Sequence, residues 1–195
     1  LHTAYRRQRQ MCIRDSLEHS GAKLLSSIEC AERMFRFGDY MLECLYPLKN
    51  STMRSVVYAM ALCDQNLTEE SMKWALDIHK QTCNEDSSIW LLKRNEEDLA
   101  LFAGDSTDET LRTALCGHII TPHLQKLSHH GINSRYFSEY VQKILKPQIL
   151  VVSVDEKNYN EDMNTQIAAL CAAGKSNAHY TCLLYTSPSP RDVEE

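Results

Sequence analysis

AERMFRFGDYMLECL, residues 31–45, is the stretch on which the fold assignment rests. Its apolar residues continue a spacing of three to four that begins at Leu24, which is typical of one face of a helix. Gly38 is expected to end this helix, because glycine readily adopts the left-handed conformation that closes a helix. Asp39 is expected to cap the next helix. The stretch therefore predicts two helices joined by a short turn.

The same combination of capping residues and regularly spaced apolar residues recurs along the chain. Further helices are predicted to begin at or near Ser51, Thr68, Asp86, Thr107, Thr121, Ser134 and Met163. Residues 40–46 are predicted to form a short helix that stops before Pro47. Residues 149–154 are β-branched and apolar, so they read either as a buried strand or as the start of a helix.

This pattern contains almost no other segment that could pair with a strand at residues 149–154. The predicted fold class is therefore all-α, built from antiparallel helical hairpins that form an α-solenoid or an irregular helical bundle. One short strand near residues 149–154 is the exception that the sequence leaves open.

The predicted hairpins recur at a spacing that can be compared with known helical repeats. Their turns lie at Gly38, Asn66 and Gly104, so they are 28 and 38 residues apart. Ala31 and Ala59 each precede a turn by seven residues, where close helix packing requires a small side chain. The pattern resembles a degenerate tetratricopeptide repeat, whose period is about 34 residues. The resemblance covers about half of residues 17–181 and implies a solenoid with a groove for a protein partner.

The two ends of the chain have a different character. Residues 6–16, RRQRQMCIRDS, and residues 182–192, CLLYTSPSPRD, resemble sequencing-adapter sequence translated in frame. Residues 1–16 and 182–195 are accordingly interpreted as adapter-derived and not native, as expected of a metagenomic sequence. Residues 17–181 are then a helical domain, or a fragment of a longer helical array.

Composition argues against several classes of protein. The formal net charge of −5 is the opposite of the basic surface that a nucleic-acid-binding protein needs. No apolar run approaches the roughly 20 residues that cross a bilayer. The native cysteines are Cys30, Cys44, Cys63, Cys83, Cys116 and Cys171. None forms a C-x-x-C pair, so reduced thiols and an intracellular location, cytoplasmic or nuclear, are expected.

Four histidines lie close together in the sequence, at His118, His123, His129 and His130. Two histidines four residues apart on a helix would form a metal-binding pair. His118 and His123 are five residues apart and are separated by Pro122, so the sequence predicts polar histidines at helix ends and no metal site.

Other candidate motifs are incomplete. The acidic runs at residues 96–98 and 105–109 are explained by solvation and by helix capping. Residues 172–176, AAGKS, end like a phosphate-binding loop, but Ala169 stands where that loop requires its first glycine. The sequence therefore predicts no catalytic, cofactor-binding or metal-binding residue and no cofactor.

Two functional hypotheses follow. The first is a non-catalytic segment of a larger helical protein that binds protein partners. The second is a helical accessory domain of an enzyme whose catalytic residues lie outside this fragment or are divided between it and the rest of the enzyme. The sequence favours the first hypothesis, because it contains no catalytic constellation.

Overall fold

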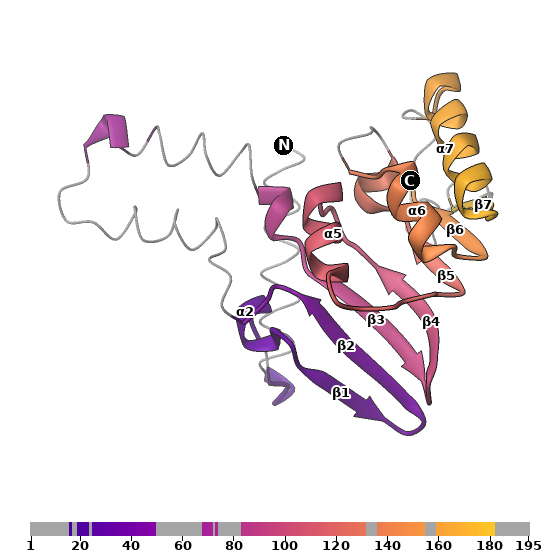
Figure 1. Cartoon of the computed structure of the whole chain (residues 1–195). Helices are drawn as coiled ribbons and strands as arrows, with labels where there is room; N and C mark the ends of the chain where they lie inside the picture. Colours follow the sequence, from indigo (N-terminus) through magenta and orange to yellow (C-terminus); the bar gives the residue numbers. More distant parts are fainter. Residues whose placement is uncertain are drawn as a thin grey trace, which may run out of the picture.

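The computed structural model describes residues 16, 19–23, 25–49, 68–71, 73, 83–131, 136–154 and 159–181. These residues form a mixed seven-stranded β-sheet with helices packed against it (Figure 1). The all-α prediction is therefore wrong, and so are the solenoid, the helical bundle and the resemblance to tetratricopeptide repeats. The fold belongs to the α/β class.

The sheet has its strands in the same order as the chain. They are β1 (Met34–Phe37), β2 (Tyr40–Tyr46), β3 (Ile89–Arg94), β4 (Glu97–Phe102), β5 (Leu124–Lys126), β6 (Ile149–Val152) and β7 (Asn177–Tyr180). The described helices are α2 (Ser27–Cys30), α5 (Asp108–Leu115), α6 (Glu139–Leu145) and α7 (Glu161–Gly174), with 3-10 turns η1 (Cys83–Asp86) and η2 (Ser128–Gly131). Strands β1 to β4 pair in antiparallel fashion, whereas β4 to β7 run parallel and are joined through α5, α6 and α7.

Two hairpins account for the largest error of the sequence analysis. Gly38 and Asp39 form the two-residue turn between β1 and β2, and Asn95 and Glu96 form the turn between β3 and β4. Gly38 has φ +61° and Asn95 has φ +56°, the conformation that hairpin turns of this length require. The stretch at residues 31–45 is thus mainly a β-hairpin, because its Gly-Asp pair reverses a strand rather than separating two helices.

Three of the helices predicted in the parallel half are present as α5, α6 and α7. Thr107 caps α5, and its Oγ1 accepts a hydrogen bond from the Thr110 N–H at 3.3 Å. Helix α6 is capped by Ser138 rather than by Ser134 and ends before Pro147. Helix α7 runs to Gly174 as expected, and β6 confirms the strand at residues 149–152. None of the helices in the described ranges has the length and apolar character that crossing a bilayer requires.

Other predicted helices fail or cannot be compared. The helix predicted after Thr121 is β5 followed by η2, and the helix predicted after Asp86 is the β3–β4 hairpin. Strand β7 was not predicted. The helix expected from Ser51 lies outside the described residues. Only the start of the helix at Thr68 is described, where Thr68 Oγ1 accepts from the Ser71 N–H at 3.1 Å.

The core lies between the sheet and its three crossover helices, which Figure 1 shows together on one side of the sheet. Its first cluster joins Leu91 and Leu101 of the sheet to Leu111 of α5 and Leu145 of α6. The second cluster joins β6 to α7. Its members include Leu150, Val152, Met163, Ile167 and Leu170. Because Leu91, Leu101, Gln125 and Leu150 occupy partnered register positions, their side chains share one face of the sheet, and each is 0% exposed.

The opposite face of the sheet is less well covered. Its residues alternate with those of the core. Cys44 and Ala100 on this face are buried, whereas Asn177 and His179 are polar and exposed. We call the following eight of its residues the open face: Leu42, Trp90, Leu92, Phe102, Leu124, Lys126, Ile149 and Val151. Seven are apolar, seven are half-buried, and Phe102 is 37% exposed. Parallel strands usually have both faces covered, so this face has the composition of a surface made for contact.

Candidate functional site

The loops that follow the parallel strands contain the most chemically suggestive side chains. Asp105 follows β4, the pair His129 and His130 follows β5, and Ser153 follows β6. In open α/β sheets the carboxyl ends of parallel strands are where ligands bind. These loops therefore form the candidate site.

The loop after β4 is a tight turn that presents Asp105. Gly104 has φ +55°, which only glycine adopts without strain, and a Cβ there would lie 3.3 Å from Ser87 Cβ. The Asp105 N–H donates to Ser87 Oγ at 3.3 Å, and the Ser106 N–H donates to the Ala103 carbonyl at 3.0 Å. The backbone of the turn is thus held from both sides.

The loop after β5 has an unusual backbone. His129 and His130 are consecutive residues in the left-handed region, with φ of +42° and +61°. Histidine tolerates this region better than most residues, but each such position still costs on the order of 1 kcal/mol. The His129 N–H donates to the Gly104 carbonyl at 3.1 Å, which joins this loop to the Asp105 turn. Strain of this kind tends to cluster at binding and catalytic sites.

The two imidazoles differ in their environment. Burial lowers the pKa of His129, and this outweighs the nearby Asp105 carboxylate, which would raise that pKa. The Nδ1 atom of His129 is buried without a hydrogen-bond partner. His130 Nδ1 lies within hydrogen-bonding distance of the Ser153 carbonyl oxygen. Because a carbonyl only accepts, Nδ1 of His130 is the donor in this hydrogen bond.

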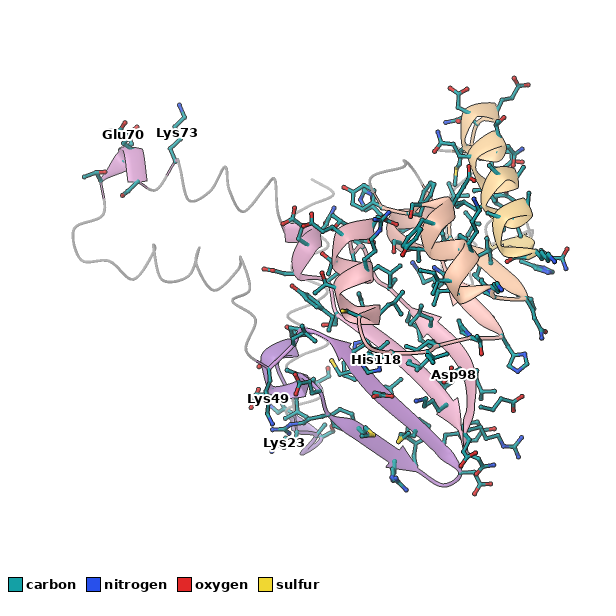
Figure 2. All side chains as sticks on the ribbon, viewed as in Figure 1. Lys23, Lys49, Glu70, Lys73, Asp98 and His118 are labelled. Carbon is teal, nitrogen blue, oxygen red and sulfur yellow. The ribbon has the colours of Figure 1, made fainter. Side chains whose placement is uncertain are left out.

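The structure divides the four clustered histidines between two regions. His118 is exposed on the loop that follows α5, where it is labelled in Figure 2. His123 lies at the start of β5, at the end of the sheet opposite the candidate site. Its Nε2 is 2.8 Å from Oε1 of Glu97, and this hydrogen bond raises the pKa of His123. Only His129 and His130 belong to the candidate site.

A surface hollow of about 680 Å³ lies at that opposite end, lined by Arg94, Glu97, His123 and Lys146 among others. His123 and Glu97 are 43% and 60% exposed, so their mutual ion pair is well solvated. Asp98, also labelled in Figure 2, accepts the Thr121 N–H at 3.0 Å and anchors the loop. These contacts give the polar side chains at the hollow a structural role. The size of the hollow alone does not make it the functional site.

The remaining motifs are placed by the fold as well. Asp108 pairs with Arg112 at 2.8 Å within α5, in agreement with a role at a helix start. The AAGKS stretch ends α7 instead of beginning a helix, and Lys175 is its left-handed C-cap. Ser176 Oγ donates to the Pro147 carbonyl. The amino-terminal helix dipole that a phosphate loop needs is therefore missing at this stretch.

The four cysteine side chains that the structure describes are free thiols. Cys30 and Cys44 are buried, Cys171 is half-buried and Cys116 is exposed. Cys63 and the side chain of Cys83 lie outside the described residues.

Across the ranges that the structure describes, no group of three or more His, Cys, Asp or Glu side chains lies in an arrangement that could hold a metal ion. The candidate site thus offers donors, but not a finished coordination shell. No protein-family model matches the chain, and none of the curated proteins matches it in sequence.

Proposed function

We propose that the chain supplies part of a divalent-metal site in a hydrolytic enzyme, with Asp105, His129 and His130 as donors. This develops one form of the second hypothesis, without its helical architecture: that hypothesis placed the catalytic residues outside this fragment or divided them between it and the rest of the enzyme. An α/β sheet with polar residues at its carboxyl edge supports that hypothesis better than it supports a helical scaffold.

The observation that carries the proposal is the state of the two imidazoles. The Nδ1 of His129 is buried and unpartnered, and the Asp105 carboxylate lies near enough to act on this imidazole electrostatically. His130 is oriented through Nδ1 by a backbone carbonyl, which is how metal-binding histidines are usually held. Imidazole nitrogen together with carboxylate oxygen is a donor set suited to zinc. A zinc ion supplies Lewis acidity for hydrolysis when it is bound.

Zinc content tests this proposal. We expect the purified chain to bind about one Zn²⁺, and His129→Ala and His130→Ala each to weaken that binding at least tenfold, because each removes a nitrogen donor. Isothermal titration with zinc chloride gives the affinity. His118→Ala is the matched control, since His118 is exposed and lies outside the site. A wild-type chain that binds no zinc, or that binds it equally well without His129 and His130, would contradict the proposal.

A second candidate function is protein–protein interaction, the first hypothesis without its helical architecture. It is favoured by the open face, where Phe102 is 37% exposed and lies next to the apolar Trp90 on the neighbouring strand. An apolar face of this kind typically marks an interface with another protein layer. The partner remains a prediction.

Self-association tests the contact role of the open face. We expect the isolated chain to associate as its concentration rises, and Phe102→Lys to reduce that association, because a charge buried in an apolar contact must lose its hydration. Sedimentation velocity measures the change. Ile119→Lys is the control, since Ile119 is 99% exposed and lies on the loop after α5. A wild-type chain that stays monomeric at all concentrations would argue against self-association through the open face.

A further inference from the structure

One short segment reaches both loops of the candidate site. It runs from Asn84 in η1 to Ser87, just before β3. Ser87 accepts the Asp105 N–H and packs against Gly104, so it supports the turn that presents the carboxylate. The same segment is fixed to α5, because the Thr110 hydroxyl donates to the Glu85 carbonyl at 3.3 Å.

The other end of this segment reaches the histidines through Tyr136. Asn84 Nδ2 donates to the Tyr136 hydroxyl at 3.2 Å. The Tyr136 ring centre lies 4.0 Å from the centre of the His129 imidazole, and the two planes are tilted by 38°. Tyr136 is only 8% exposed, so its ring is itself held in place by packing. The imidazole of His129 therefore has a fixed aromatic wall on one side.

We propose that Tyr136, held by Asn84, is a positioning residue that fixes the His129 imidazole beside Asp105. The backbone of His129 is already in the left-handed region, which sets the direction of its Cα–Cβ bond. The imidazole can still rotate about its own side-chain bonds, and the Tyr136 ring blocks rotation on one side. Asn84 fixes the ring in turn, so the segment from Asn84 to Ser87 braces Asp105 and His129 together. The role in metal binding rests on the function proposed above, whereas the ordering of His129 does not.

The first measurement is zinc affinity. We expect Tyr136→Leu to weaken zinc binding about tenfold, within the range usual for residues that orient a ligand. Tyr136→Phe keeps the ring and loses only the hydrogen bond to Asn84, so we expect a smaller loss, of about threefold or less. Tyr140→Leu is the matched control, because Tyr140 is 58% exposed on α6 and its ring contacts Arg112 instead of a histidine.

The second measurement does not depend on metal. Diethyl pyrocarbonate modifies neutral imidazoles that it can reach, and mass spectrometry assigns the modified histidine. We expect Tyr136→Leu to raise the modification rate of His129 several-fold in metal-free protein, while the exposed His179 reacts at its wild-type rate. Circular dichroism of each variant confirms that the sheet is retained.

The two measurements separate the two proposals. Weaker zinc binding together with faster modification of His129 supports both. Faster modification in a chain that binds no zinc supports the role of Tyr136 and removes the metal site. Zinc affinity and His129 reactivity that both stay at wild-type values in Tyr136→Leu would overturn the positioning role.

Discussion

Replacing Leu91 by alanine is expected to lower the free energy of unfolding by about 2–5 kcal/mol, the range for a large buried residue cut back to alanine. Leu91 is 0% exposed and lies in the middle of β3, where it packs with Leu101 and with α5 and α6. The lost side chain would leave a cavity that rigid neighbours on both sides cannot close. Urea denaturation followed by circular dichroism measures the change.

Leu92 provides the control for this prediction. It is the next residue of the same strand and points to the open face, where it is only half-buried. We expect Leu92→Ala to lower the free energy of unfolding by about 1–2 kcal/mol, because less apolar surface returns to water. Equal losses in the free energy of unfolding for the two variants would mean that the alternation of side chains between the two faces of the sheet does not determine their burial.

The second large effect concerns the reactivity of Cys44. Burial, and next to it the neighbouring Cys30, raise the pKa of the Cys44 thiol to about 11. The thiolate is the reactive form, so at pH 8 its population falls roughly 100-fold relative to an ordinary cysteine. We expect iodoacetamide to label Cys44 at least 100-fold more slowly than the exposed Cys116, as measured by mass spectrometry over time.

The same shift has a consequence for stability, and its sign is clear. A thiol whose pKa is raised on folding stays neutral in the folded protein, while the unfolded chain ionises near pH 9. The contribution of the neutral Cys44 thiol to the free energy of unfolding is therefore fully present below about pH 9 and is lost as the pH rises toward 11. Labelling in denaturing urea is the control, since Cys44 and Cys116 should then react at similar rates. Fast labelling of Cys44 in the folded protein would refute its burial.

The parallel half of the fold could be predicted from sequence to a useful extent. Thr107 and Pro147 mark helix boundaries by local chemistry, through capping and through the missing proline N–H, and both marks hold in the structure. Three of the residues 149–152 are β-branched, which favours a strand wherever partners exist. Those partners could not be seen, because β5 has only three residues and β7 was not recognised.

The antiparallel half failed because its turns are ambiguous in isolation. Gly38-Asp39 can close a helix or form a two-residue hairpin turn, since both need a residue with positive φ. Asn95-Glu96 raises the same ambiguity and was read as part of a helix. Apolar residues in short strands can match a helical period by coincidence, and pairing across a sheet decides between the two. That information is not local.

The candidate site was missed for a related reason. Asp105 and His129 are far apart in the sequence and meet only because β4 and β5 are neighbouring parallel strands. Their loops are joined through Gly104 and His129, a contact that depends on the sheet. The adjacent pair His129 and His130 was the one sequence signal for the candidate site. The nearby His118 and His123, which lie elsewhere in the fold, made that signal harder to recognise.

The agreement between strand order and chain order bears on how the molecule assembles. Each strand pairs with the strand that precedes it in the chain, so none has to be inserted between two others already joined. Pairing between successive strands keeps the contacts of the sheet between neighbouring parts of the chain; the two hairpin connections are short, and the connection between β2 and β3 is the longest. A chain growing from the ribosome could therefore extend this sheet at one edge, each strand templated by the one made just before it.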